Sequence, residues 1–138
     1  MPSITKTPVE VTESFHHQIT DDEAAAMFRA ALNLFDQWEL TERQAAILLH
    51  VSKRTLSRWK AARMPGRLGQ EGKVRLSHLM GIHKSLRIIF REPHRGYSWI
   101  KAPNTQFDGR SALDVMLGGT LGDLLRVRKL LEAEVFGG

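Results

Sequence analysis

Apolar residues recur at helical spacing in several separate stretches of the chain, which predicts an all-α fold. The first stretch lies between residues 24 and 38, where one side of a helix would be apolar. Its apolar positions are Ala24, Met27, Ala31, Leu34, Phe35 and Trp38. Thr20 precedes the stretch as a typical helix cap, and three carboxylates follow it where the helix dipole is positive. Stabilisation of the helix end explains these carboxylates better than acid–base catalysis.

A second and a third helix follow, separated by a short turn. Thr41 and Gln44 have the spacing of a capping box that opens the second helix. After the turn His50-Val51-Ser52, the serine caps a third helix over residues 53–62. Two short helices joined by a three-residue turn form a helix-turn-helix.

The outward face of residues 53–62 carries the side chains that a recognition helix presents to the major groove of DNA. Leu56 and Trp59 are expected to face the core, which leaves the polar residues on the opposite side. The residues expected to contact DNA are Ser52, Lys53, Arg54, Ser57, Arg58 and Lys60. The alternative is a helix pair that serves only as a scaffold or mainly for dimerisation.

The second half of the chain predicts further helices. The stretch "RMPGRLGQEG", residues 63–72, is rich in glycine, which is typical of a connector. A helix over about residues 73–90 follows, with Gly81 at a close helix contact and His83 as a hydrogen-bonded core residue. Its apolar side is formed by Val74, Leu76, Leu79, Met80, His83, Leu86 and Phe90.

Three turn and cap signals organise the last third. A short helix follows Pro93 and is broken before Pro103. Ser111 caps another short helix ending near residue 117, and a last helix spans about residues 121–135. Its apolar face carries Leu124, Val127, Leu131 and Val135.

The N-terminal residues 1–19 show no sustained period, and we expect a mobile arm with "VEV" as a short strand. The beginning of the chain lacks the pattern of a secretory signal. No apolar run approaches the roughly 20 residues that span a bilayer, so no membrane partner is expected. The chain contains no cysteine, which suits a reducing cytoplasm.

The net charge of +5 is unevenly distributed. Residues 1–40 have a net charge of −5 and residues 76–138 of +3, whereas residues 41–75 carry nine Lys or Arg against two carboxylates, a net +7. Clustered cations displace the counterions of phosphates, so this segment favours an anionic polymer as partner. A solvated basic face without a partner is the plainer interpretation of charge alone.

Motifs of catalysis and of metal or cofactor binding are missing from the sequence. The six histidines show no HExxH spacing, and there is no GxSxG, Walker loop or GxGxxG. We therefore expect no metal, no cofactor and no enzymatic activity. The histidines are His16, His17, His50, His78, His83 and His94.

The run "AAILLHVSKRTLSRWK", residues 45–60, resembles the helix-turn-helix of Xre-like repressors. Those repressors usually place glycine at the turn, where the backbone is left-handed, and this chain has His50. The later pattern "W…PN…F.G…ALDVML..G" resembles the C-terminal toxin-binding domain of the Xre/MbcA/ParS antitoxin family. Ala112 stands where that family usually has proline. The matching residues are Trp99, Pro103, Asn104, Phe107, Gly109, Leu113 and Asp114.

The resemblance implies domains and partners that the residues alone do not supply. It divides the chain into a helix-turn-helix region (20–63), a connector (64–72) and a toxin-binding domain (73–138). Members of the family neutralise RES-domain toxins, which consume NAD, by occluding the active-site cleft, and they repress their own operon. The implied partners are such a toxin and operator DNA, with a homodimer inside a larger toxin–antitoxin complex of type II.

Most motif residues are expected to mark the fold, with Trp99, Phe107 and Leu113 in the core. The expected toxin contacts lie on the last helix and tail: Arg126, Lys129, Phe136, Gly137 and Gly138. Phe136 is either an anchor for the toxin or a last plug of the core. Two other classes remain open: a stand-alone repressor whose C-terminal half only dimerises, and a regulator that responds to a small molecule.

Overall fold

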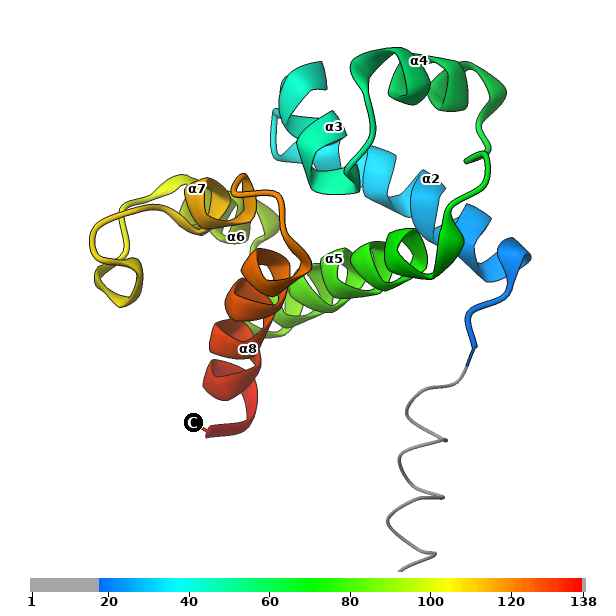
Figure 1. The fold of residues 1–138 in the computed structure, drawn as a ribbon. Coiled ribbons are helices and arrows are strands. Elements are labelled where there is room, and N and C mark those ends of the chain that lie inside the picture. The colour runs from blue at the N-terminus through cyan, green and yellow to red at the C-terminus, as the bar shows by residue number, and fades with distance from the viewer. Residues whose placement is uncertain (1–17, 138) are drawn as a thin grey trace, which may run out of the picture.

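Four helices, α2, α3, α4 and α7, begin directly after the capping residues that the sequence predicts. The computed structural model describes residues 18–137, and this part of the chain is all-α, as predicted, with no strand (Figure 1). The elements are α2 (Asp21–Gln37), α3 (Glu42–Leu49), α4 (Lys53–Ala62), α5 (Gly69–Ile89), α6 (Pro93–Lys101), the short 3₁₀ turn η1 (Thr105–Phe107), α7 (Ala112–Met116) and α8 (Leu121–Gly137).

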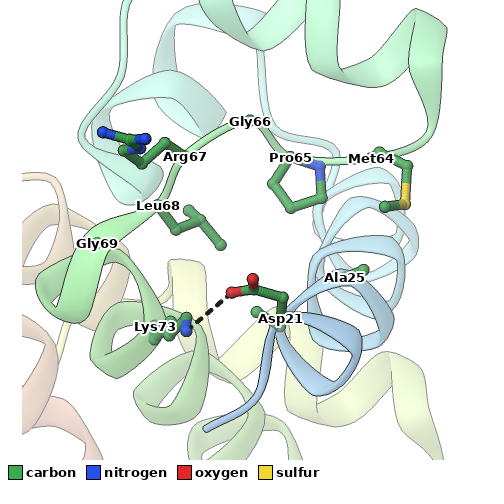
Figure 2. Close-up of a pocket in the computed structure, with 10 residues that line it drawn as sticks. Asp21, Ala25, Met64, Pro65, Gly66, Arg67, Leu68, Gly69 and Lys73 are labelled. Carbon is green, nitrogen blue, oxygen red and sulfur yellow. Dashed lines mark ion pairs between the residues drawn. The ribbon is translucent and has the colours of Figure 1, made fainter.

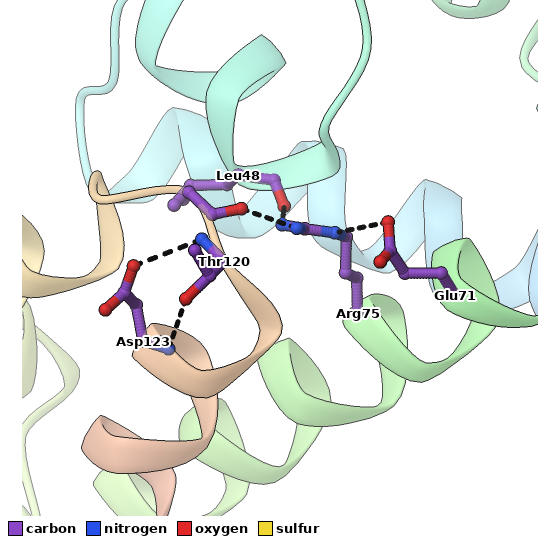
Figure 3. Close-up of polar contacts among 6 residues, drawn as sticks. Leu48, Glu71, Arg75, Thr120 and Asp123 are labelled. Atoms are coloured by element: carbon purple, nitrogen blue, oxygen red, sulfur yellow. Dashed lines mark hydrogen bonds and ion pairs between the residues drawn. The ribbon is translucent and has the colours of Figure 1, made fainter.

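Reciprocal capping boxes start four of these helices, including α8, where Thr120 and Asp123 exchange the two bonds (Figure 3). Thr20 caps α2, Thr41 caps α3 and Ser111 caps α7, each accepting a hydrogen bond from the third backbone N–H of its helix. Ser52 accepts from the backbone N–H of Thr55 at 3.0 Å and so begins α4. These local bonds fix the helix boundaries because they satisfy N–H groups that would otherwise lack a partner.

Helix α5 is the central helix, against which helices of both halves of the chain pack. Figure 1 shows α2 crossing its first half, with α3 and α4 on that side, and α8 lying beside it. Arg75 near the start of α5 contacts Gly119 just before α8, and Ser77 contacts Arg128 farther along, so α5 and α8 run in the same direction. Both halves of the chain share one core. Its largest fully buried side chains include Phe28, Trp38, Leu48, Leu56, Ile82, Ile100, Met116 and Leu124.

Helix α5 begins at Gly69, four residues before the position that the sequence predicts. Two of the glycines that predict a connector instead belong to the first turn of α5. Gly69 has a φ of +66°, which only glycine adopts readily, and it makes the turn into the helix. A side chain at Gly72 would collide with Leu68, since its Cβ would lie 2.8 Å from a methyl carbon of that residue.

The buried face of α5 also differs from the predicted one. Ile82 is fully buried, whereas the predicted core position His83 is half-buried and its Nδ1 has no hydrogen-bond partner. The prediction of a hydrogen-bonded core histidine is therefore wrong. The buried residues of α5 are Arg75, Leu76, Leu79, Ile82, Ser85 and Leu86, while Val74, Met80 and Phe90 are only partly buried. Both α2 and α8 pack against α5, and their positions decide which of its residues are buried.

The close contact predicted at Gly81 is confirmed, because the Arg128 guanidinium lies where a side chain would begin. Helix α8 extends through Gly137, two residues beyond the end that the sequence predicts. Phe136 is 84% exposed and is not a plug of the core. The expected short strand, nearly all of the N-terminal arm and Gly138 lie outside the described residues.

Candidate interaction surfaces

The turn between α3 and α4 has the backbone of a helix-turn-helix. His50 ends α3 in the left-handed conformation, with φ 58° and ψ 45°, where the resembling repressors use glycine. The Val51 N–H donates to the carbonyl oxygen of Ala46 at 3.0 Å and closes the turn.

Two contacts hold α4 against the core. Leu56 and Trp59 are buried on its inner side, as predicted. The Trp59 ring meets the Phe28 ring of α2 edge to face, with 5.9 Å between ring centroids. This packing turns the opposite face of α4 to solvent. The predicted DNA contacts on that face, all exposed, are Ser52, Lys53, Arg54, Ser57, Arg58 and Lys60.

Glu42 at the start of α3 divides this exposed face into two groups. Its carboxylate pairs with the Lys60 ammonium at 3.0 Å and accepts a hydrogen bond from the Ser57 hydroxyl at 3.4 Å. The hydrogen bond from Lys60 and its positive charge lower the pKa of Glu42. Lys60 and Ser57 are thus tied to α3, whereas no ion pair within residues 18–137 engages Arg54 or Arg58.

A buried arginine joins the helix-turn-helix to the C-terminal half (Figure 3). Arg75, only 2% exposed, donates to the Leu48 carbonyl oxygen at the end of α3 and to the Gly119 carbonyl oxygen before α8. Glu71 lies 3.7 Å from its Nε, an ion-pair distance that is too long for a hydrogen bond. The hydropathy pattern alone could not show that Arg75 is buried, because a charged side chain usually lies at the surface.

The motif residues of the second half build a compact turn. The Asn104 side chain accepts from the Gln106 N–H at 2.8 Å, and Gly109, with φ +87°, donates its N–H to the Asn104 carbonyl. Phe107 and Leu113 are buried, as predicted. Trp99 is only partly buried: it packs against the edge of the core and also lines a surface groove. The remaining markers in this turn are Pro103, which bridges to Ser111, and Asp114, which completes the cap of α7.

Helix α8 presents a mixed cationic and aromatic stripe to solvent. Leu124, Val127 and Leu131 are buried against α5, and Arg126, Lys129 and Phe136 are exposed. At 100° per residue, these three exposed residues fall on the side opposite the buried ones. The Arg126 guanidinium lies 5.2 Å from the centroid of the Phe107 ring, a cation–π contact. Gly137, the last residue of α8, is exposed beside them.

A cavity of about 540 Å³ lies between the start of α2 and the segment before α5 (Figure 2). Figure 2 shows Lys73 reaching across it to Asp21, and the two charged groups are 3.0 Å apart. Lys73 also donates to the Ile19 carbonyl oxygen at 2.9 Å. The Lys73 ammonium therefore already has partners within the chain.

No group of three or more His, Cys, Asp or Glu side chains within residues 18–137 is placed to hold a metal ion. Among the described helices, none combines the length and the hydropathy that crossing a membrane requires.

The fold and the two surfaces define a class: an all-α protein in which a helix-turn-helix precedes a helical domain with its own exposed terminal helix. Residues 17–81 match the family model of the antitoxin Xre-like helix-turn-helix domain. Residues 85–137 match that of the antitoxin Xre/MbcA/ParS C-terminal toxin-binding domain. The two matched regions meet inside α5, so no linker separates them.

Two known proteins are similar to this chain, one in sequence and one in fold. The uncharacterized protein y4oB of Sinorhizobium fredii (strain NBRC 101917 / NGR234) is 42% identical over 113 residues, which are 81% of this chain and 83% of that protein. The fold is similar to a chain in the crystal structure of the M. tuberculosis MbcT-MbcA toxin-antitoxin complex. That match has a TM-score of 0.55 and 24% identity, over 82% of this chain and 94% of the other. The protein therefore belongs to the Xre/MbcA/ParS antitoxin family, and it is an antitoxin with a helix-turn-helix domain and a toxin-binding domain.

Proposed function

We propose that this antitoxin binds a RES-domain toxin, which consumes NAD, and occludes the active site of that toxin. We further propose that it represses its own operon by binding operator DNA as a homodimer. The antitoxin acts by steric occlusion, so this function asks for no catalytic group, cofactor or metal on its side. The proposed function requires one surface that binds the toxin and a second surface that binds DNA.

The exposed stripe of α8 is the observation that carries the toxin-binding part. Phe136 leaves 84% of its surface in water, so its ring is accessible to a pocket of a partner. Aromatic residues are frequent anchors of interfaces, and truncating one often weakens binding by about 2 kcal/mol or more. Arg126 and Lys129 supply a polar surround on the same side of the helix. Gly137 follows with no side chain to obstruct a narrow cleft.

The exposed cations of α4 support the DNA-binding part. Arg54 and Arg58 are long side chains on its outward face that no ion pair engages within residues 18–137. An arginine can make two hydrogen bonds to a guanine, or one charged contact to a phosphate. The surrounding segment 41–75 has a net charge of +7, which favours association with a polyanion.

Growth rescue tests the toxin-binding part. The toxin encoded beside this gene is expressed alone, with the full chain, or with a chain that ends at Val135. We expect the full chain to restore growth and the NAD level, and the truncated chain to fold and bind operator DNA but to give no protection. Met64→Ala is the matched control, since Met64 is 50% exposed but lies in the helix-turn-helix half.

Two outcomes would contradict the proposal at different levels. If the truncated chain protects at equal abundance, the end of α8 is not the inhibitory element. If the toxin stops growth while NAD stays constant, the partner is not an NAD-consuming RES toxin. The alternative of a stand-alone repressor, whose C-terminal half only dimerises, is not favoured by the match to a toxin-binding domain. It would be supported if no complex with the neighbouring gene product forms in a pull-down.

A further inference from the structure

A groove of about 320 Å³ opens on the C-terminal half, next to the end of α8. Its floor is apolar and comes from three elements: Ile89 and Phe90 at the end of α5, Trp99 of α6, and Leu130 of α8. Its rim is polar and includes the exposed side chains of Gln106 and Glu134. An apolar floor with a few polar groups around it is the usual composition of a recognition site.

The groove and the exposed aromatic residue of α8 lie at the same end of the molecule. The lining of the groove itself places the end of α5, with Ile89 and Phe90, beside the last turns of α8, with Leu131 and Glu134. Ile88, which is 57% exposed, and Phe136 therefore lie at this end as well. Figure 1 shows the end of α8 far from α4, so a partner bound here would leave the recognition helix free.

Trp99 is the residue that sets this surface apart. The two other tryptophans are core residues, with exposures of 0% for Trp38 and 7% for Trp59. Trp99 packs only partly and presents the rest of its ring to the groove. An indole at a groove wall combines a large apolar area with restricted side-chain motion, and both properties favour binding of a partner.

The position of the groove in the chain favours the toxin as its partner. Every residue of the groove falls within residues 85–137, the segment matched by the toxin-binding domain. The cavity of Figure 2, by contrast, is lined by residues of the helix-turn-helix half. Glu134 makes no ion pair within the described part of the chain, so its carboxylate is available to a cation of the partner.

We propose that this groove receives an apolar side chain of the toxin, with a Lys or Arg of the toxin beside it that pairs with Glu134. The proposal rests on the proposed function, because it takes the toxin as the partner, and it adds a second contact site to the stripe of α8. The groove residues and the stripe lie on different sides of the last two turns of α8, so the toxin would straddle the end of that helix.

Fluorine NMR of the full chain labelled with 5-fluorotryptophan can observe the groove directly. The chain has three tryptophans, and the Trp99→Phe variant assigns the resonance of Trp99. We expect titration with the toxin encoded by the neighbouring gene to shift the Trp99 resonance. The resonances of the buried Trp38 and Trp59 should stay in place. The probe detects binding at the groove independently of growth.

A charge reversal tests the predicted pairing. Glu134→Lys should weaken the complex at least tenfold in calorimetry, and should keep the fold because lysine suits the last turn of a helix. Asp36→Lys is the matched control, since Asp36 is also an exposed carboxylate in the last turn of a helix, α2, outside the groove. We expect this control to bind like the unchanged chain.

The possible results separate the groove from the function. If no complex forms with the unchanged chain, the proposed function fails. If a complex forms while the Trp99 resonance stays in place and Glu134→Lys binds like Asp36→Lys, the groove proposal is wrong and the function stands. If the Trp99 resonance shifts with the concentration of the antitoxin alone, a second copy of this chain occupies the groove, which also overturns the proposal.

Discussion

Single residues of this protein carry interactions that join its two halves. Arg75 is only 2% exposed, and it contacts both the last turn of α3 and the residue before the cap of α8. Carbonyl groups at the end of a helix lack partners and carry partial negative charge, which suits a buried guanidinium. In the sequence Arg75 is only a charged residue next to the apolar positions of a predicted helix. Its buried hydrogen bonds to the two carbonyl groups could therefore not be predicted.

Replacing Arg75 by methionine should lower the free energy of unfolding by about 2–4 kcal/mol, because the carbonyl groups of Leu48 and Gly119 would lose their common buried donor. Urea denaturation measures the change. Arg87→Met, at an exposed position of the same helix, should change stability by less than about 0.5 kcal/mol. Equal destabilisation in the two variants would show that Arg75 does not hold the halves together.

Two half-buried histidines make the fold sensitive to acid. Burial lowers the pKa of His78 and of His83, and positive charges lower it further, from Arg128 beside His78 and from Arg87 beside His83. Glu132 opposes part of this effect at His78. In the unfolded chain each pKa returns to about 6.5, so below that pH the unfolded state binds more protons than the folded state.

Stability should therefore fall as the pH decreases through about 6.5, and the contribution of these residues should be fully present above it. Thermal unfolding between pH 7.5 and pH 5.5 measures this. The double variant His78→Gln, His83→Gln should lose less stability over the same range. His94→Gln, at an exposed position, serves as control and should follow the unchanged chain. A double variant with the unchanged pH dependence would refute the assignment.

At the scale of elements, boundaries set by local hydrogen bonds could be predicted and boundaries set by packing could not. The starts of α2, α3, α4 and α7 follow from capping residues that the sequence displays. The start of α5 does not, because it has no side-chain cap and begins at a glycine with positive φ. The sequence also predicts the end of α8 too early, since glycine signals a helix stop and here the helix continues to Gly137.

Helix α4 leads to a prediction on DNA binding. Arg54→Ala combined with Arg58→Ala should weaken operator binding by about 1–3 kcal/mol for each arginine that reads a base, because both side chains project from the outward face. Toxin binding should remain. Lys84→Ala combined with Arg87→Ala removes the same charge from exposed positions of α5 and should change operator affinity much less. A gel shift in which both double variants bind equally would reject α4 as the recognition helix.

At the scale of the whole molecule, the class of fold and the two surfaces follow from the sequence, but their mutual arrangement does not. Periodicity predicts each helix separately, and nothing in it states that α5 and α8 run in parallel. That direction depends on contacts such as Arg128 with Ser77, between residues far apart in the chain. It brings Trp99 and Glu134 to one groove, which the sequence alone does not display.

The proposed DNA binding through α4 leads to a prediction on the arrangement of the operator. The described chain holds one helix-turn-helix, and a single recognition helix reads only a half-site. We therefore expect a dimer on an inverted repeat, with half-site centres separated by about one helical turn, roughly 10–10.5 base pairs, or a multiple of it.

Inserting five base pairs between the half-sites tests this geometry, because half a turn places the second half-site on the opposite face of the duplex. Affinity for the altered operator should fall to that for an isolated half-site, while insertion of ten base pairs should restore part of it if the dimer can span the longer distance. Sedimentation at the same concentrations should show a dimer on the unaltered operator. A monomer that binds with full affinity, indifferent to the five-base-pair insertion, would mean that α4 acts alone and that the proposed homodimer is not needed for repression.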